Sequence, residues 1–143
     1  MLDRDRILGK LDALEGYERE LADTAPARYE EYLALREKRR ACERILQVSV
    51  ECVIDICHLL VSGLRLGLPA GEEDIFDKLA QARILPEEIL DIARRMRRFR
   101  NILVHEYGEI DHAIVFRLAV TAGHDFGRVR AAVLKALSKG EQR

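Results

Sequence analysis

The residues of this chain best suited to chemistry lie in one short string: Arg100, Asn101, Ile102, Leu103, Val104, His105, Glu106 and Tyr107. An arginine carries a permanent charge and a planar fork of N–H donors that fits a phosphate. A histidine titrates near neutral pH and can both take and give a proton. Chemistry at a phosphate needs a base, an acid and a cation that stabilises the phosphate oxygens. Arg100 and His105 together supply these groups.

The spacing of Arg100 and His105 limits how they can act together. Five residues of an α-helix turn through about 500°, which leaves the two side chains about 140° apart. They therefore do not share one face of a straight helix. Either the helix ends or distorts near Val104, as Gly108 just downstream favours, or His105 works with the arginine of a second subunit. Both arrangements are compatible with the sequence.

Arg100 breaks the pattern of the helix expected over residues 86–104. Projection at 100° per residue places it inside an apolar face. That face is formed by Ile89, Ile92, Ala93, Met96, Phe99 and Leu103. A guanidinium close to a core needs a partner. One interpretation is a structural ion pair, with Glu51 or Asp55 as the carboxylate. The other is an arginine held rigidly for anion recognition.

The same segment, RRMRRFRN, has five arginines in eight residues. The whole chain has a net charge of -1, so this run is a local positive patch. Arg94, Arg95 and Arg98 project away from the apolar face and are expected to be solvated. A phosphate backbone is a partner that fits such a patch. Aromatic residues are sparse here, which does not favour sequence-specific reading of bases.

A polar stripe marks the long apolar helix expected around residues 45–64. Its members recur at spacings of four, four, three and four: Gln47, Glu51, Asp55, His58 and Ser62. The stripe is interpreted first as the one solvent-facing side of a buried helix. The alternatives are the lining of a polar cavity, a subunit interface, or the start of a carboxylate metal site. Di-metal sites in bundles require more inward carboxylates than Glu51 and Asp55, so we expect no metal.

Helical periodicity and few helix breakers predict an all-α fold. Hydrophobic residues make up 48% and charged residues 34% of the 143 residues, which is typical of a folded domain and not of a disordered chain. Helices are expected over 3–24, 27–64, 72–84 and 86–104, followed by one broken or two short helices over 111–121 and 124–137. We expect one up-and-down helical bundle over residues 1–138, with a frayed tail at 139–143.

The cysteines and the apolar stretch argue against other classes of protein. Cys42, Cys52 and Cys57 lie on one expected helix, at spacings that forbid a disulfide between them. They are interpreted as small buried hydrophobes in a reducing cytosol. Residues 45–64 contain Glu51 and Asp55, which disfavours a membrane span. The charged N-terminus has no apolar signal core, so we expect a cytoplasmic protein.

The string from Arg100 to Tyr107 resembles the R-x4-H-x-Y motif of HepT proteins in the HEPN superfamily. Asparagine directly after the arginine and tyrosine two residues after the histidine extend the match. The segment QVSVECVIDICHLL is similar to that family's second helix, and AQARILPEEILDIARRMRRFRN is similar to its approach to the motif. The resemblance covers roughly residues 40–110, and the order of the expected helices fits the whole chain.

The resemblance implies a homodimeric HEPN-like bundle that acts as the metal-independent endoribonuclease toxin of a type VII-like HepT/MntA toxin–antitoxin system. Arg100 and His105 match the family's catalytic pair, and Asn101 matches the polar residue that often follows the arginine. Tyr107 matches the tyrosine to which an MntA-type nucleotidyltransferase antitoxin adds AMP. Both copies of the motif would line one cleft between subunits. RNA, as tRNA or mRNA, would be the substrate, and no cofactor is implied.

Glu51 and Asp55 are expected to orient Arg100, because a carboxylate would satisfy the guanidinium in the free enzyme. An alternative function is a non-catalytic HEPN bundle that binds a nucleotidyltransferase partner or RNA, with the motif as a relic or a modification site only. The replacement Arg100→Ala separates the two functions. Cleavage collapses under the first, and only partner binding changes under the second.

Overall fold

The computed structural model describes residues 2–105 and 110–141, with side chains as far as residue 139. Six α-helices make up most of this part: α1 (Arg4–Thr24), α2 (Tyr29–Ala34), α3 (Arg36–Gly63), α4 (Glu72–Gln81), α5 (Glu87–His105) and α6 (His112–Glu141). The described residues contain no strand, and the predicted all-α class is confirmed.

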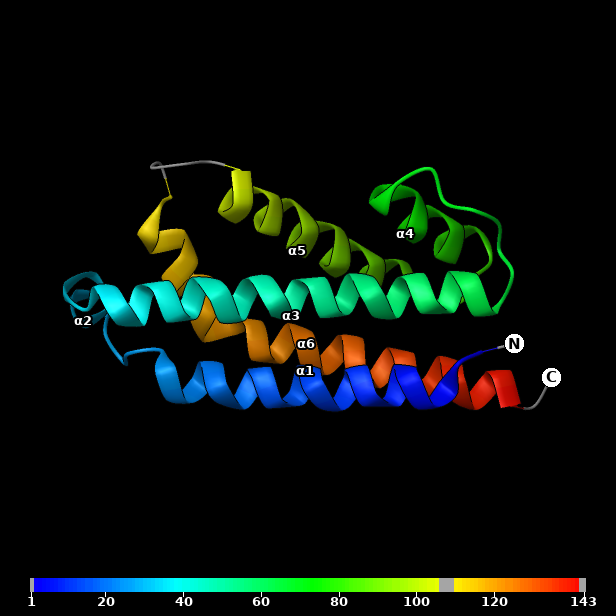
Figure 1. Cartoon of the computed structure of the whole chain (residues 1–143), viewed down its shortest axis with the longest axis horizontal. Coiled ribbons are helices and arrows are strands. Elements are labelled where there is room, and N and C mark those ends of the chain that lie inside the picture. Colours follow the sequence, from blue (N-terminus) through cyan, green and yellow to red (C-terminus); the bar gives the residue numbers. More distant parts are fainter. Residues whose placement is uncertain (1, 106–109, 142–143) are drawn as a thin grey trace.

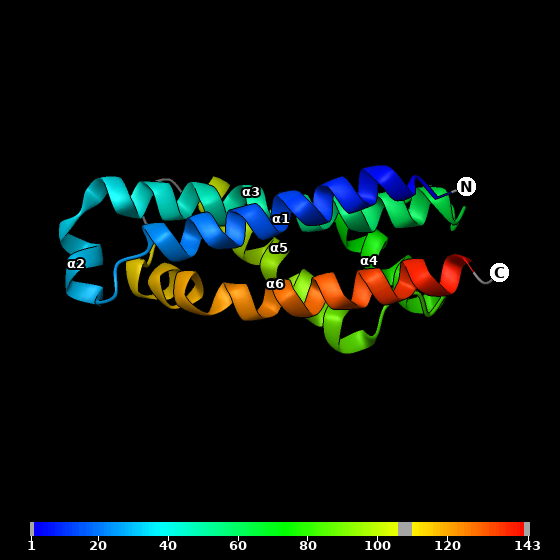
Figure 2. The same ribbon diagram turned by 90° about the horizontal axis from the view of Figure 1, so that it is seen from below.

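Three long helices form the body of the bundle. α1, α3 and α6 run side by side along the long axis of the molecule (Figure 1 and Figure 2). α5 packs on α3 and α6, on the other side of α3 from α1, and α4 lies beside the C-terminal half of α3 (Figure 1). Each of the other five helices contacts α3, which is therefore the central element of the core.

α3 has the length and apolar character of a membrane span, the one such helix in the described part of the chain. In the structure, 61% of its most apolar window is buried inside the bundle, as is typical of a core helix. Ser49 is the buried polar residue of the core, and its hydroxyl donates to the carbonyl of Ile45 at 2.6 Å. This bond satisfies the hydroxyl within the helix itself.

Local sequence signals set several helix ends. Asp3 caps α1, because its Oδ1 accepts from the backbone N–H of Arg6 at 3.2 Å. Pro86 stands directly before α5, where a residue without an N–H costs nothing. Asp111 caps α6 through the backbone N–H of Ala113, at 3.0 Å. The starts of these helices are thus fixed by residues next to them in the chain.

The predicted continuous helix over 27–64 is wrong at Leu35, where φ of −104° and ψ of 84° separate α2 from α3. No proline or glycine marks the break. It allows α2 to turn, so that the fully buried ring of Tyr32 packs against Phe116 of α6, with centroids 5.3 Å apart. Tyr29 packs on the same ring at 5.6 Å. Burial of these rings outweighs the few hydrogen bonds lost at the break.

The predicted break in the last helix is also wrong, because α6 is one helix of 30 residues. Gly123 and Gly127 each cost about 1 kcal/mol relative to alanine in a helix interior. A continuous buried stripe offsets this cost: Val115, Ala119, Ala122, Phe126, Val129, Val133 and Leu137. α6 continues as far as Glu141, into the segment expected as a tail. α4 instead ends at Gln81, three residues before its predicted end at 84.

Candidate active site

The string that carries the candidate chemistry lies at the C-terminal end of α5. Arg100 and Asn101 are helical, and the described part of α5 extends to His105, whose side chain is exposed. Tyr107 lies outside the described residues. Because the helix continues through Val104, Arg100 and His105 point to different sides of α5 within one protomer. The described part of α5 ends at His105, one residue after Val104, and its helical backbone does not bring the two side chains together within one protomer.

Arg100 is held by two neighbours. Its side chain is 14% exposed, and Nη2 donates to Oε1 of Glu72. Nε donates to Oδ1 of Asn101 at 3.0 Å. Nη1 makes no such contact with a described residue. The guanidinium is thus fixed on two sides, and the donors of Nη1 stay available.

Glu51 and Asp55 do not orient Arg100, contrary to the prediction. Oδ2 of Asp55 lies 3.0 Å from Nζ of Lys10 on α1, and Oε1 of Glu51 accepts from Nε2 of Gln47 at 3.1 Å. These carboxylates belong to the polar stripe of α3, where Asp55, His58 and Ser62 are exposed and Glu51 and Gln47 are half-buried. In the single protomer the stripe is therefore a solvent-facing side of α3.

Glu72, the carboxylate that holds Arg100, is the first residue of α4. It is shared with a second arginine, because Nε of Arg97 donates to its Oε1 at 2.9 Å. Nη1 of Arg97 also lies 3.5 Å from Glu73. A carboxylate in a first helical turn is itself favoured by the positive end of the helix dipole. One stabilised anion thus anchors two arginines that follow each other by one turn on α5.

The sequence offered one signal for this contact that the prediction did not use. Three acidic residues open the helix that follows Gly71: Glu72, Glu73 and Asp74. They oppose the basic run of α5 once α4 and α5 pack together. Charge complementarity between the two helices could have indicated the pairing, but it could not have identified which carboxylate meets which arginine.

The basic run of α5 is divided between paired and free arginines. Arg94 is predicted to be solvated, but in the structure its side chain is only 17% exposed. It lies within 4 Å of four carboxylates: Glu73, Asp77, Glu87 and Asp91. Burial alone would lower the pKa of Arg94, but the hydrogen bond to Asp77 and the nearby carboxylates outweigh burial and raise it. Arg95 and Arg98 are exposed and form no salt bridge with a described residue. These two remain free to attract phosphate.

The cysteines are core residues, as predicted. Cys42, Cys52 and Cys57 are at most 6% exposed, and none forms a disulfide. Burial raises the pKa of the Cys57 thiol to about 12 and also raises the pKa of the other two thiols. Neutral thiols are poor nucleophiles, so these side chains serve packing. In the described part of the chain, no cluster of three or more His, Cys, Asp or Glu is arranged to hold a metal ion.

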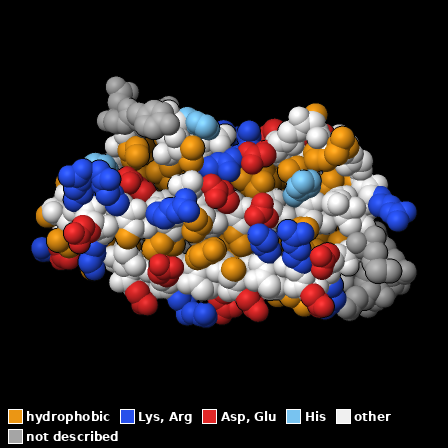
Figure 3. Space-filling model, viewed as in Figure 1, with side chains coloured by type: hydrophobic (Ala, Val, Ile, Leu, Met, Phe, Trp, Pro, Cys, Tyr) orange, Lys and Arg blue, Asp and Glu red, His pale blue; other side chains and the backbone are white. Residues whose placement is uncertain are grey.

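An apolar groove of about 310 Å³ lies beside the candidate site, between α3, α5 and α6. Met96, Phe99 and Ile102 line it from α5, and Ile114 and Leu118 line it from α6. Ile102 and Ile114 are 43% and 46% exposed. The face formed by α1 and α3, by contrast, carries interspersed acidic and basic side chains (Figure 3). The exposed apolar surface of α5 and α6 thus includes Phe99 and Ile102, the chain neighbours of Arg100 and Asn101.

Solved structures support the fold. The tri-AMPylated HEPN toxin of Shewanella oneidensis, solved in complex with its MNT antitoxin, superposes with a TM-score of 0.81 and 25% identity, over 91% of this chain and 96% of that one. YutE, a cytosolic protein of Bacillus subtilis, superposes equally well at 19% identity, over 97% of this chain and 93% of that one.

Curated relatives match by sequence over a shorter segment. The mRNA nuclease HepT of Shewanella oneidensis is 33% identical over 81 residues, 57% of this chain and 61% of that protein. The tRNA nuclease HepT of Aphanizomenon flos-aquae is 33% identical over 87 residues, 61% of this chain and 59% of that protein. The chain thus matches about 60% of the length of these relatives. The family model described as "Ribonuclease HepT-like" matches residues 11–133. The chain therefore belongs to the HepT-like ribonuclease family.

Proposed function

We propose that this protein is a metal-independent endoribonuclease, the toxin of a type VII-like toxin–antitoxin pair with an MntA-type nucleotidyltransferase. The observation that carries the proposal is the family's motif at the end of α5, with Arg100 fixed and His105 exposed. Two curated relatives are named as mRNA and tRNA nucleases, which supports RNA as the substrate. We place the activity in the cytoplasm, where the YutE protein is described.

The reaction divides between two side chains. The 2′-hydroxyl attacks the adjacent phosphorus, its proton goes to a base, and the bond to the 5′-oxygen breaks as that oxygen receives a proton. His105 is the residue suited to the proton transfers. Arg100 is suited to the crowded phosphate, since the donors of Nη1 are not used by Glu72 or Asn101. Asn101 supports the reaction by fixing Nε. The products are a 2′,3′-cyclic phosphate and a 5′-hydroxyl.

Binding of the RNA strand rests on charge. Arg95 and Arg98 are exposed and without a salt bridge to a described residue, whereas Arg94 and Arg97 are held by carboxylates. Free guanidinium groups beside the reacting pair attract the phosphate backbone without reading bases. This supports an RNA substrate recognised through its backbone, whose 2′-hydroxyl the mechanism requires.

The active form is a homodimer under this proposal. Arg100 and His105 lie on different sides of α5, so an arginine and a histidine from two copies complete one cleft. The apolar groove beside the motif supports this arrangement, because exposed Ile102 and Ile114 give a second copy surface to cover. Glu51 and Asp55, which do not contact Arg100 in the protomer, have no role in this scheme.

Neutralisation is by AMP addition to Tyr107. The similar toxin of Shewanella oneidensis is described as tri-AMPylated and in complex with its MNT antitoxin, which supports the same modification here. Tyr107 follows His105 by two residues. AMP at this position adds negative charge and a base close to the reacting groups, which repels and blocks an RNA phosphate.

A second candidate function is favoured by one observation: Arg100 is already paired in the protomer. A non-catalytic bundle that docks a nucleotidyltransferase or RNA would use the arginine only to join α5 to α4. Incubation of total RNA and of tRNA in EDTA with the wild type, Arg100→Ala and His105→Ala decides between the two. Cleavage by the wild type alone supports the nuclease. No cleavage by AMP-free wild type supports the binding module.

A further inference from the structure

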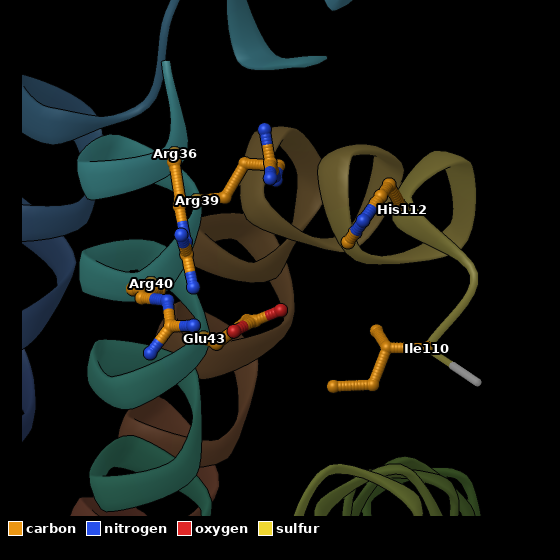
Figure 4. A pocket seen from close by; sticks show the side chains of 6 residues that line it. All are labelled: Arg36, Arg39, Arg40, Glu43, Ile110 and His112. Carbon is orange, nitrogen blue, oxygen red and sulfur yellow. The ribbon is translucent and has the colours of Figure 1, made fainter. Parts of the chain in front are cut away.

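A basic pocket lies at the end of the bundle where α3 and α6 begin. It has a volume of about 470 Å³. Its lining residues are Arg36, Arg39, Arg40, Glu43, Ile110 and His112. Arg39 and Glu43 extend from α3 towards His112 on α6 (Figure 4). Basic side chains also gather over this end of α3 on the surface (Figure 3). Three guanidinium groups thus face one carboxylate and one histidine.

Two of the three arginines of this pocket make no contact that would hold the fold together. Arg36 and Arg40 are exposed and form no salt bridge with a described residue, unlike Arg94, Arg97 and Arg100 on α5. Of the three pocket arginines, Arg39 alone has a bond, a donation from Nη1 to the carbonyl of Leu33. The carbonyl of Leu33 carries no net charge, so this hydrogen bond does not neutralise the charge of Arg39.

These three arginines also lie where the helix dipole disfavours positive charge. Arg36 is the first residue of α3, and Arg39 and Arg40 follow within the next turn. The start of a helix is the positive end of its dipole, which favours anions and disfavours cations. Like charges three and four residues apart also repel one another. A cluster that lowers the stability of its own helix, and in which Arg36 and Arg40 form no salt bridge with a described residue, is typical of a binding site.

The pocket lies within reach of the candidate active site. Ile110, which lines the pocket, follows His105 by five residues, so their Cα atoms are separated by at most roughly 18 Å. The end of α5 and the first turns of α3 and α6 are at the same end of the molecule (Figure 1). A strand of a few nucleotides spans such a distance.

We propose that this pocket binds a backbone phosphate of the RNA strand, a few nucleotides away from the bond that is cut. The proposal rests on the proposed nuclease function and adds a phosphate site that is separate from Arg100 and His105. Arg36 and Arg40 supply the charge, and Arg39 and His112 form the walls on either side. Glu43 carries the same sign of charge as the phosphate and limits its affinity.

Binding of an uncleavable probe tests the pocket independently of catalysis. The probe is a fluorescent 20-nucleotide 2′-O-methyl RNA, which lacks the attacking hydroxyl, and anisotropy is measured between 0.05 and 0.3 M salt. Each lost contact to a single strand contributes about 0.7 to the salt slope and about 0.7 to log K at 0.1 M salt. R36A/R40A should therefore bind about 25-fold more weakly at 0.1 M salt, with a slope lower by about 1.4. E43Q should bind more tightly than the wild type.

The matched control is R65A/R83A, which removes two exposed arginines outside the pocket, one just after α3 and one between α4 and α5. It should bind as the wild type does. R36A/R40A should also melt at or above the temperature of the wild type, because it removes cations from the start of α3. Equal weakening in both double variants would show an effect of overall charge alone and overturn the proposal. Unchanged binding of R36A/R40A, or no binding by the wild type, would also overturn it.

Free AMP distinguishes a site for the RNA backbone from a site for mononucleotides. Competition by millimolar AMP that depends on Arg36 and Arg40 would contradict the assignment to RNA. If R36A/R40A loses binding while wild-type protein fails to cut RNA, the pocket stands as a nucleic-acid site and the proposed nuclease function fails. If the wild type cuts RNA and R36A/R40A binds normally, the pocket assignment alone fails.

Discussion

The replacement Glu72→Gln tests how Arg100 is held in position. Glu72 accepts from Arg100 and, at 2.9 Å, from Arg97, while the Arg100 side chain is 14% exposed. A hydrogen bond to a charged group contributes about 1.5–3 kcal/mol when it is buried. The Glu72 side chain is 36% exposed, so screening favours the lower end of that range, about 1.5 kcal/mol. Loss of an anion from the first turn of α4 adds about 0.5 kcal/mol. The free energy of unfolding should fall by about 2 kcal/mol.

Urea denaturation at neutral pH measures this difference as a lower midpoint with an unchanged slope. The matched control is Glu87→Gln. Glu87 is 69% exposed and is one of four carboxylates around Arg94, at 3.6 Å from Nη1. Glu87 is also an anion in the first turn of a helix, so its replacement should cost about 0.5 kcal/mol, the contribution of the helix dipole alone. A loss below about 0.5 kcal/mol for Glu72→Gln, or equal losses for both variants, would refute the role of Glu72 as the anchor.

Three other outcomes are expected. Glu51→Ala and Asp55→Ala should leave RNA cleavage intact and cost less than about 1 kcal/mol of stability each, because neither residue contacts Arg100; a collapse of cleavage would contradict the assignment. The Cys57 thiol should resist alkylation by iodoacetamide at pH 8 in the native protein, and rapid alkylation would argue against its burial. Because the folded state holds the thiol proton more tightly than the unfolded state, the contribution of Cys57 to stability should be complete below pH 9 and be lost as the pH rises towards 12. Incubation with an MntA-type antitoxin and ATP should add AMP to the wild type and not to Tyr107→Phe, by intact mass; equal labelling of both would place the modification elsewhere.

Local signals made the starts of the helices predictable. Asp3, Pro86 and Asp111 act on residues within one turn of themselves, so the chain sequence alone contains the information. The burial of α3 was also predictable, since apolar residues lie on nearly all sides of this helix. The break at Leu35 was not, because its cause is the packing of Tyr32 on Phe116, more than 80 residues away in the sequence.

The candidate site was predictable by residue type but not by contact. The position of Arg100 on an apolar face correctly indicated that it needs a partner, and the structure places it at 14% exposure beside a carboxylate. That carboxylate is Glu72, 28 residues away, on a helix whose orientation depends on the loop over residues 64–71. Helical projection relates residues within one helix and cannot rank carboxylates on different helices. The predicted need for a partner is therefore correct, but the predicted partners, Glu51 and Asp55, are wrong in the protomer.

Cleavage of one RNA oligonucleotide and its 2′-deoxy counterpart in EDTA tests the central claim most directly. The wild type, Arg100→Ala and His105→Ala are compared, with Arg65→Ala, an exposed residue just after the C-terminal end of α3, as a control. We expect the wild type and the control to cut only the RNA, leaving a 2′,3′-cyclic phosphate, and both site variants to lose at least about 100-fold in rate. Cleavage of the deoxy strand, or normal cleavage by either site variant, would contradict the assignment of Arg100 and His105 as the catalytic pair.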